Sequence, residues 1–168
     1  DKKETTAAST AKKESTRTVN KKIDLPVFMY DMTNVYPVAQ DSVMTIDGTA
    51  AVTDGGKVTY QWYVNNVDSN GGGTKIDGAT DAVYIPDTSE VGTKFYYVVA
   101  SNEKDNTYNS GTSVTVPVVV LQKGEWTTDE FGGIRYLSPD GTYPSNLQVM
   151  IDGNVYLFEG SGDGMALY

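Results

Sequence analysis

Short alternating apolar runs, separated at close intervals by turn residues, are the feature that most constrains this chain. Between residues 23 and 121, no stretch of useful length repeats its apolar residues at the helical period. Instead, runs such as KVTYQWYV (57–64) and TKFYYVVASN (93–102) alternate, with Gly, Asp, Asn and Pro between them. This spacing is typical of an all-β domain. The sequence therefore predicts an all-β fold.

The alternation within these runs assigns side chains to the two faces of each strand. Tyr60, Trp62 and Val64 fall on one face of the first run, and Tyr63 falls on the other. In SVMTIDGTAAVT (42–53), the even-numbered positions from 46 to 52 share a face. The proline in LPVFMY predicts that this run is an edge strand.

A tryptophan in one run and a spaced tyrosine in another form the most specific motif of the chain. Trp62 lies in YQWY, and YVVASN places Tyr96, Val98 and Ala100 at alternating positions. A core Trp that faces a Tyr-x-Cys pair on a second strand marks the immunoglobulin sandwich. The stretches VTDGGKVTYQWYVNN and VYIPDTSEVGTKFYYVVASN accordingly resemble the bacterial immunoglobulin-like domains of surface proteins.

This resemblance also implies roles for individual residues. It implies a structural core made of Trp62, Tyr96, Val98 and Ala100. Val98 stands where related domains carry a disulfide cysteine. The chain has no cysteine, so apolar packing has to replace the bridge. We expect Ala50 or Val52 to face Val98, because the bridge partner lies about a dozen residues before the Trp.

The C-terminal part of the chain carries a repeated outline of its own. The stretches 132–143 and 152–163 share the pattern Gly-x-x-Tyr-Leu at an interval of 20 residues, and each contains an Asp-Gly turn. Both therefore read as short aromatic β-hairpins. Units of this size cannot bury their apolar faces alone, so they stack in sequence.

These hairpins resemble the cell-wall-binding, choline-binding-type repeats of Gram-positive surface proteins. IDGNVYLFEGSGDGM keeps the Asp-Gly turn, Tyr156, Phe158 and Met165 of such a unit, while Val155 and Leu157 replace two of its aromatic residues. In that family, Trp and Tyr rings cage the ammonium of choline through cation–π attraction. The resemblance implies a ligand site made of Trp126, Tyr136, Tyr143, Tyr156 and Phe158.

Two interpretations of the aromatic hairpins stay open. They bind a cell-wall polymer or glycan, or they form a structural appendage, a degenerate repeat that packs on the sandwich. Fewer units are present than a stable solenoid normally needs, since such arrays require about three.

Residues 1–22 differ from the rest of the chain in charge. They carry a net charge of +4, whereas the remainder carries −13, and Val19 is their one large aliphatic residue. Such a segment buries too little apolar surface to offset the entropy of ordering. We expect a disordered, flexible linker; the alternatives are a helical arm and a basic stretch that touches anionic cell-wall polymer. The acidic body argues against nucleic-acid binding.

The composition also restricts the chemistry available to the chain. It has no Cys and no His, which removes thiolate nucleophiles, thiolate zinc sites and histidine relays. Most Asp residues adjoin Gly or Asn, where they serve turns. DSNGGG (68–73) lacks the closing carboxylate of a calcium loop, whose position Ala79 occupies. We therefore predict no enzymatic activity, no cofactor and no metal site. No apolar run is long enough to span a membrane.

Taken together, these features predict a non-enzymatic, extracellular bacterial protein, either secreted or at the cell surface. A linker (1–22) leads to an immunoglobulin-like β-sandwich (23–121) and then to a β-hairpin repeat segment (122–168). The expected function is adhesion or presentation, with the hairpins contacting cell wall or glycan. A purely structural spacer and an accessory domain of a larger extracellular hydrolase are the alternatives. The oligomeric state is left open.

Overall fold

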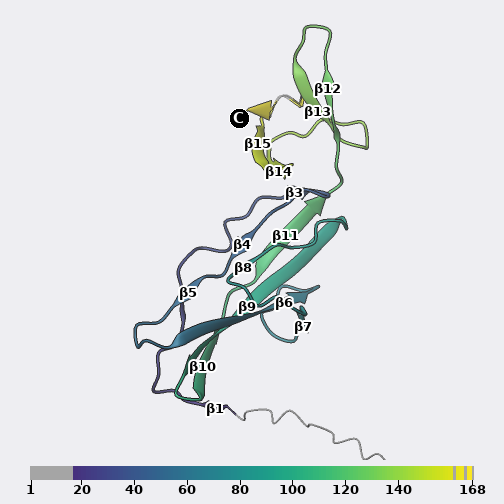
Figure 1. The fold of residues 1–168 in the computed structure, drawn as a ribbon. Helices are drawn as coiled ribbons and strands as arrows, with labels where there is room; N and C mark the ends of the chain where they lie inside the picture. Colours follow the sequence, from purple (N-terminus) through teal and green to yellow (C-terminus); the bar gives the residue numbers. More distant parts are fainter. Residues whose placement is uncertain (1–16, 161, 165, 168) are drawn as a thin grey trace, which may run out of the picture.

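The computed structural model describes residues 17–160, 162–164 and 166–167, which form an elongated all-β molecule without a helix (Figure 1). The all-β prediction is confirmed. The strands are β1 (Thr18–Val19), β2 (Val27–Phe28), β3 (Val38–Ala39), β4 (Ile46–Asp47), β5 (Ala50–Ala51), β6 (Lys57–Asn65), β7 (Thr74–Lys75), β8 (Val83–Tyr84), β9 (Gly92–Lys104), β10 (Thr107–Thr112), β11 (Val116–Leu121), β12 (Glu125–Thr128), β13 (Ile134–Leu137), β14 (Leu147–Ile151), β15 (Asn154–Phe158) and β16 (Ala166–Leu167).

One sheet runs along the whole molecule. Its strand order is β1-β10-β9-β11-β3-β14-β15-β16, and β6 pairs with β9 and with β7. The long β9 is its centre, because β6 pairs along one side while β10 and β11 pair along the other. Three two-stranded sheets accompany it, namely β2–β5, β4–β8 and β12–β13.

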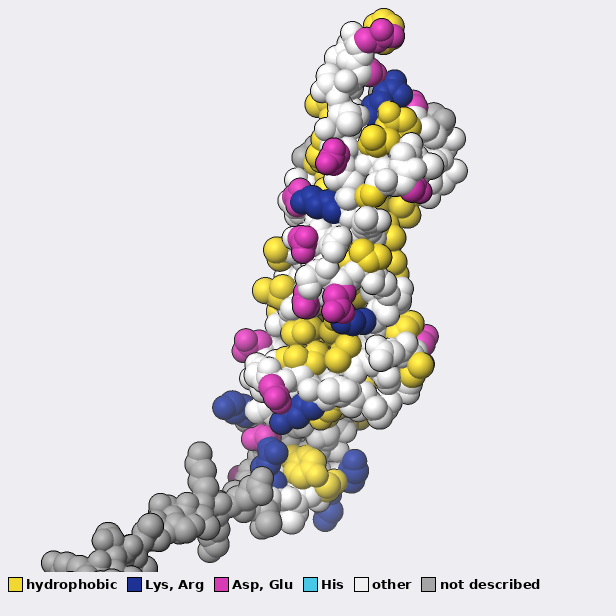
Figure 2. Space-filling view, turned by 90° about the vertical axis from the view of Figure 1, so that its right-hand side faces the viewer, with side chains coloured by type: hydrophobic (Ala, Val, Ile, Leu, Met, Phe, Trp, Pro, Cys, Tyr) yellow, Lys and Arg dark blue, Asp and Glu magenta, His cyan; other side chains and the backbone are white. Residues whose placement is uncertain are grey.

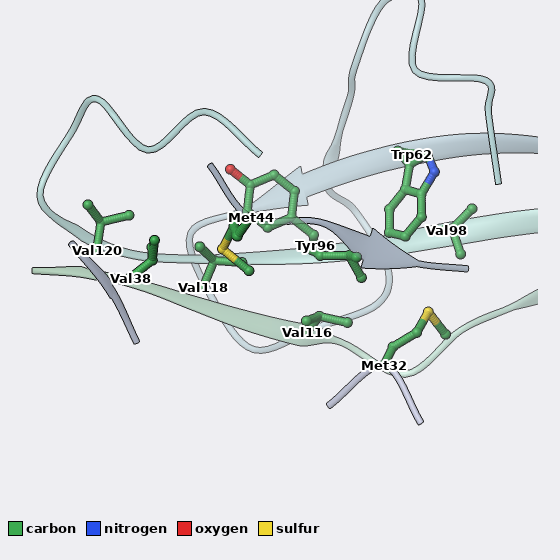
Figure 3. Packing of buried hydrophobic residues seen from close by; sticks show 10 residues of the cluster. Met32, Val38, Met44, Trp62, Tyr96, Val98, Val116, Val118 and Val120 are labelled. Atoms are coloured by element: carbon green, nitrogen blue, oxygen red, sulfur yellow. The ribbon is translucent and has the colours of Figure 1, made fainter. Parts of the chain in front are cut away.

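The main core lies between the long sheet and the short strands from residues 27 to 51 and 83 to 84, which gives the body a sandwich-like character (Figure 3). Side chains from both layers meet there. The buried members are Met32, Val38, Met44, Ile46, Trp62, Tyr96, Val98, Val116, Val118 and Val120.

Trp62 is the largest side chain in this core and is fully buried. It pairs in register with Val98 across β6 and β9, and its Nε1 donates a hydrogen bond of 2.8 Å to the Asp81 carbonyl. Its ring stacks on Tyr84 at 5.4 Å between centroids. Tyr96, Val98 and Ala100 are likewise buried. Burial raises the pKa of the Tyr96 phenol to about 12.

The residue that faces Val98 from the second layer is Gly48, and the expectation of Ala50 or Val52 was wrong. A Cβ at Gly48 would lie 2.8 Å from the Trp62 ring and 3.0 Å from Val98 Cγ1. Ala50 is buried at another place, beside the Tyr60 hydroxyl that accepts a hydrogen bond from its N–H. The indole fills the space that a side chain at position 48 would need.

In the N-terminal part of the chain, the structure differs from one expectation and agrees with another. Of the linker assigned to residues 1–22, residues 1–16 lie outside the described residues. Thr18 and Val19 form β1 in parallel with Thr107 and Tyr108 of β10, so this part of the segment is a strand. The proline-containing run at 25–30 yields β2, which pairs with β5 alone among the described strands, as an edge strand does.

No helix in the described part of the chain is long and apolar enough to cross a membrane.

Candidate functional site

The C-terminal segment contains two consecutive antiparallel strand pairs, β12–β13 and β14–β15. Asp152 and Gly153 connect β14 to β15 with φ angles of 48° and 88°. Two successive positive φ angles are those of a type I′ turn, which Asp-Gly favours strongly. The Asp-Gly signal therefore located this turn correctly, but the hairpin spans 147–158 and not the expected 152–163, because β15 pairs with the strand before the turn.

The first pair begins earlier than the sequence predicted. The hairpin expected at 132–143 is not formed. Ile134–Leu137 instead pairs in antiparallel fashion with the preceding strand, Glu125–Thr128. Residues 138–142 make a separate tight turn, in which the Ser138 N–H donates to the Thr142 carbonyl over 2.8 Å. The Asp140-Gly141 signal marks this turn and not the connection between two paired strands.

Asp129 organises the true connection between β12 and β13. Its Oδ1 accepts hydrogen bonds from the N–H groups of Phe131 (2.9 Å) and Gly133 (2.8 Å), and its Oδ2 accepts one from Arg135 Nε (3.0 Å). The Gly133 bond, followed by the contact with Arg135, holds the pKa of Asp129 below its usual value. The ordered loop presents Phe131 with 88% of its surface exposed.

Four of the five predicted ligand residues meet in one aromatic stack. Trp126 and Tyr136 are directly paired across β12 and β13, with ring centroids 4.9 Å apart. Trp126 also lies 4.9 Å from the Tyr156 ring, and Tyr136 lies 5.8 Å from the Phe158 ring. The stack therefore links the two strand pairs through ring contacts at the separations that aromatic pairs prefer.

Burial divides the stack into an inner and an outer half. Phe158 is fully buried and Tyr136 is 6% exposed, and both pack with Ala39 of the sandwich. The Tyr136 hydroxyl accepts a hydrogen bond of 2.6 Å from the Gly124 N–H, and burial raises the pKa of this phenol. Trp126, by contrast, is 39% exposed. The inner rings act as core, and the outer tryptophan faces solvent.

The fifth predicted ligand residue lies outside the stack. The ring of Tyr143 packs against the backbone of Gly164, and 37% of Tyr143 is exposed. Met165, which belongs to the quoted repeat pattern, lies outside the described residues. The structure thus brings Trp126, Tyr136, Tyr156 and Phe158 together and leaves Tyr143 to one side.

Main-chain hydrogen bonds attach this segment to the end of the sandwich. The Met150 N–H donates to the Pro37 carbonyl over 2.8 Å, beside the parallel bridge between β14 and β3. The Asp152 N–H donates to the buried Ser42 hydroxyl over 3.0 Å. Within the C-terminal segment itself, Lys123 Nζ lies 2.8 Å from Asp152 Oδ1, and this hydrogen bond raises the pKa of Lys123.

The geometry limits what the aromatic stack can bind. A cage for a quaternary ammonium needs several open ring faces around one cavity. The rings of Tyr136 and Phe158 are not open, because both are packed in a hydrophobic cluster. Trp126 keeps an exposed part from which it can stack on one sugar ring. In the described residues, no group of three or more carboxylates is placed to hold a metal ion.

Sequence reasoning missed two features that shape this region. The bond between Ser42 and Asp152 joins residues more than a hundred positions apart, and no local pattern signals such a contact. The role of Asp129 could have been found from the sequence. Asp129 is followed by Gly132 and Gly133, and Asp and Gly at such close spacing are typical of a loop.

No protein-family model matches this sequence, and neither a curated protein nor a solved structure matches it.

Proposed function

We propose that this chain is a non-enzymatic presentation module of an extracellular bacterial protein, with an immunoglobulin-like sandwich as its body and the C-terminal segment as a firmly attached tip. In this function the sandwich displays the tip, because it holds the tip at the end of the molecule opposite to β1 (Figure 1).

The immunoglobulin-like assignment draws its support from the packing around Trp62. The ring is enclosed beside Val98 on the neighbouring strand, and Gly48 faces both residues from the second layer. Tyr96 is buried two positions before Val98. A buried Trp beside two facing core positions, with a Tyr two residues before one of them, is the arrangement expected of an immunoglobulin-like sandwich, and it supports the proposal.

The observation that carries the presentation function is the continuity of the long sheet. Parallel pairing of β3 with both β11 and β14 leads from the sandwich directly into the tip. β1 and β16 lie at opposite ends of the elongated molecule (Figure 1). A sheet that crosses the junction resists bending better than a flexible linker, so the tip keeps a fixed direction.

The surface of the molecule agrees with a role outside the cell. Acidic side chains are spread along the face in Figure 2, between small apolar patches. A net charge of −9 favours solubility and disfavours association with nucleic acid.

The experiment for this proposal is surface labelling of the organism that encodes the chain. An antibody raised against the purified protein should label intact cells or precipitate the protein from the culture medium. Signal that appears only after the cells are permeabilised would contradict an extracellular role.

Glycan binding by the tip is the second candidate function, and the exposure of Trp126 favours it. A solvent-exposed indole can stack on the apolar face of a sugar ring, as aromatic side chains do with flat ligands, and this stacking contributes a modest binding free energy. Sedimentation with insoluble peptidoglycan should retain the wild-type chain and lose the Trp126→Ala variant. Tyr30→Ala is the matched control, because Tyr30 is an exposed aromatic residue (60%) on the body. Equal retention of all three proteins would dismiss a site at Trp126.

A further inference from the structure

The outer edge of β8 carries unpaired main-chain groups. Among the described strands β8 pairs with β4 alone, with Ile46 opposite Tyr84. The Gly48 N–H donates to the Ala82 carbonyl over 2.8 Å, which makes 82 and 84 the hydrogen-bonded positions of this antiparallel pair. Because such positions alternate, Val83 and Ile85 direct their N–H and C=O groups away from β4.

A cavity of about 400 Å³ lies beside this open edge. Its lining includes Trp62, Ile76, Ala79 and Tyr84. The volume falls within the range of about 300–1,000 Å³ that small-ligand pockets occupy. The cavity therefore has room for one large apolar side chain next to a strand edge.

The rim of the cavity is acidic. Asp77 and Asp81 line it, and both are exposed. No lysine or arginine is among the lining residues in the part of the chain that the structure describes. Val83 (44%) and Ile85 (59%) add exposed apolar surface along the edge itself. Charge complementarity at this rim favours a cationic partner.

We propose that the β8 edge and the adjoining cavity bind an extended peptide segment that carries an apolar side chain flanked by lysine or arginine. The peptide adds one strand to β8 through the main-chain groups of Val83 and Ile85. Its apolar side chain enters the cavity over Tyr84, and the basic side chains on the same face meet Asp77 and Asp81. This mode obtains affinity from main-chain bonds and specificity from the pocket.

A designed nine-residue peptide is the probe. It has a central leucine, lysines two and four residues to either side, and threonines between them, so that leucine and lysines share one face of a strand. The readout is the indole N–H signal of Trp62 in an NMR titration, since Trp62 Nε1 donates to the Asp81 carbonyl at the rim. The chain has two tryptophans, and the Trp126 signal serves as the internal control.

We expect the Trp62 signal to shift in a saturable manner at about 1 mM peptide or below, the range of weak specific contacts, while the Trp126 signal stays in place. A peptide with glutamates in place of the lysines should not bind. The Asp77→Asn/Asp81→Asn variant should bind the lysine peptide about three- to tenfold more weakly, as two exposed ion pairs allow. The Glu125→Gln/Glu130→Gln variant makes the same change of net charge at the tip and should bind as the wild type does.

The Val83→Pro variant tests strand addition itself. Proline removes the outward N–H of Val83 and leaves the β4–β8 bonds intact, so the variant should fold with an unchanged melting temperature and lose peptide binding. The proposal is overturned if the lysine peptide does not shift the indole N–H signal of Trp62. It is also overturned if the two charge variants bind this peptide with equal affinity, or if folded Val83→Pro binds it as well as the wild type does. A dimer of the free protein that Val83→Pro dissociates would also overturn it, because a second copy would then occupy the edge.

Discussion

Gly48 lies directly against the ring of Trp62. A Cβ on Gly48 would be 2.8 Å from Trp62 Cζ2, closer than real Cβ atoms approach a neighbour. The absence of a side chain at position 48 leaves room for the indole and for its cross-strand neighbour Val98 beneath the second layer. The buried indole, Gly48 and Val98 therefore form one close-packed apolar contact between the two layers.

The substitution Gly48→Ala should therefore destabilise the protein by about 1–3 kcal/mol, the range for overpacking a core. Urea unfolding followed by tryptophan fluorescence measures the change. Gly71→Ala is the matched control, because Gly71 has open space around it and no positive φ. Equal stability of the two variants would show that position 48 tolerates a side chain.

The inner half of the aromatic stack should behave as core. Phe158→Ala removes a fully buried ring and should lower the free energy of unfolding by about 3–5 kcal/mol. Its neighbour Leu157 is 37% exposed, so Leu157→Ala should cost clearly less. Comparable losses for the two variants in a urea titration would speak against Phe158 as the anchor of the tip.

Acid should loosen the loop that presents Phe131. The pKa of Asp129 is lowered in the folded protein, first by the Gly133 N–H and then by Arg135, from an ordinary value of 3.8. A lowered carboxyl pKa contributes stability that is complete above that ordinary value and is lost as the pH falls through the native pKa. The amide NMR signals of Phe131 and Gly133, followed from about pH 6 to about pH 2, should move with a midpoint below 3.8. A midpoint at or above that value would contradict the bonding of Asp129, and Asp129→Asn should abolish the transition.

Alkali should weaken the main core through Tyr96. Burial raises its pKa from 10.0 to about 12, so the unfolded chain releases this proton at lower pH than the folded one. The contribution of Tyr96 to stability is therefore complete below pH 10.0 and is lost as the pH rises to about 12. Urea midpoints measured across this interval should fall more steeply for the wild type than for Tyr96→Phe. Parallel slopes would mean that Tyr96 ionises as freely as an exposed tyrosine.

Much of the fold could be predicted from local pattern. The alternation in 57–64 and 93–102 located β6 and β9, in which Trp62, Tyr96, Val98 and Ala100 are buried as the pattern of period two predicted. The Asp-Gly pair at 152–153 located the turn between β14 and β15 for an equally local reason, since the type I′ turn requires two positive φ angles.

The contacts between distant segments could not be predicted in this way. Gly48 and Ala50 are both buried and stand at alternate positions of one segment, so which of them faces Val98 depends on how the two layers are placed. The parallel bridge between β3 and β14 depends on strands of two and five residues far apart in the chain. In the candidate site, the sequence supplied the aromatic residues, but burial of Tyr136 and Phe158 follows from packing on Ala39.

The central claim is that the tip and the sandwich form one rigid unit, and residual dipolar couplings test it most directly. Couplings of the amide groups in β6 and β9 define one alignment tensor, and those in β14 and β15 define another. We expect a single tensor to fit both sets, because β3 joins them in one sheet. Two tensors of different magnitude or orientation would show that the tip moves independently, and the presentation function would then lose its physical basis.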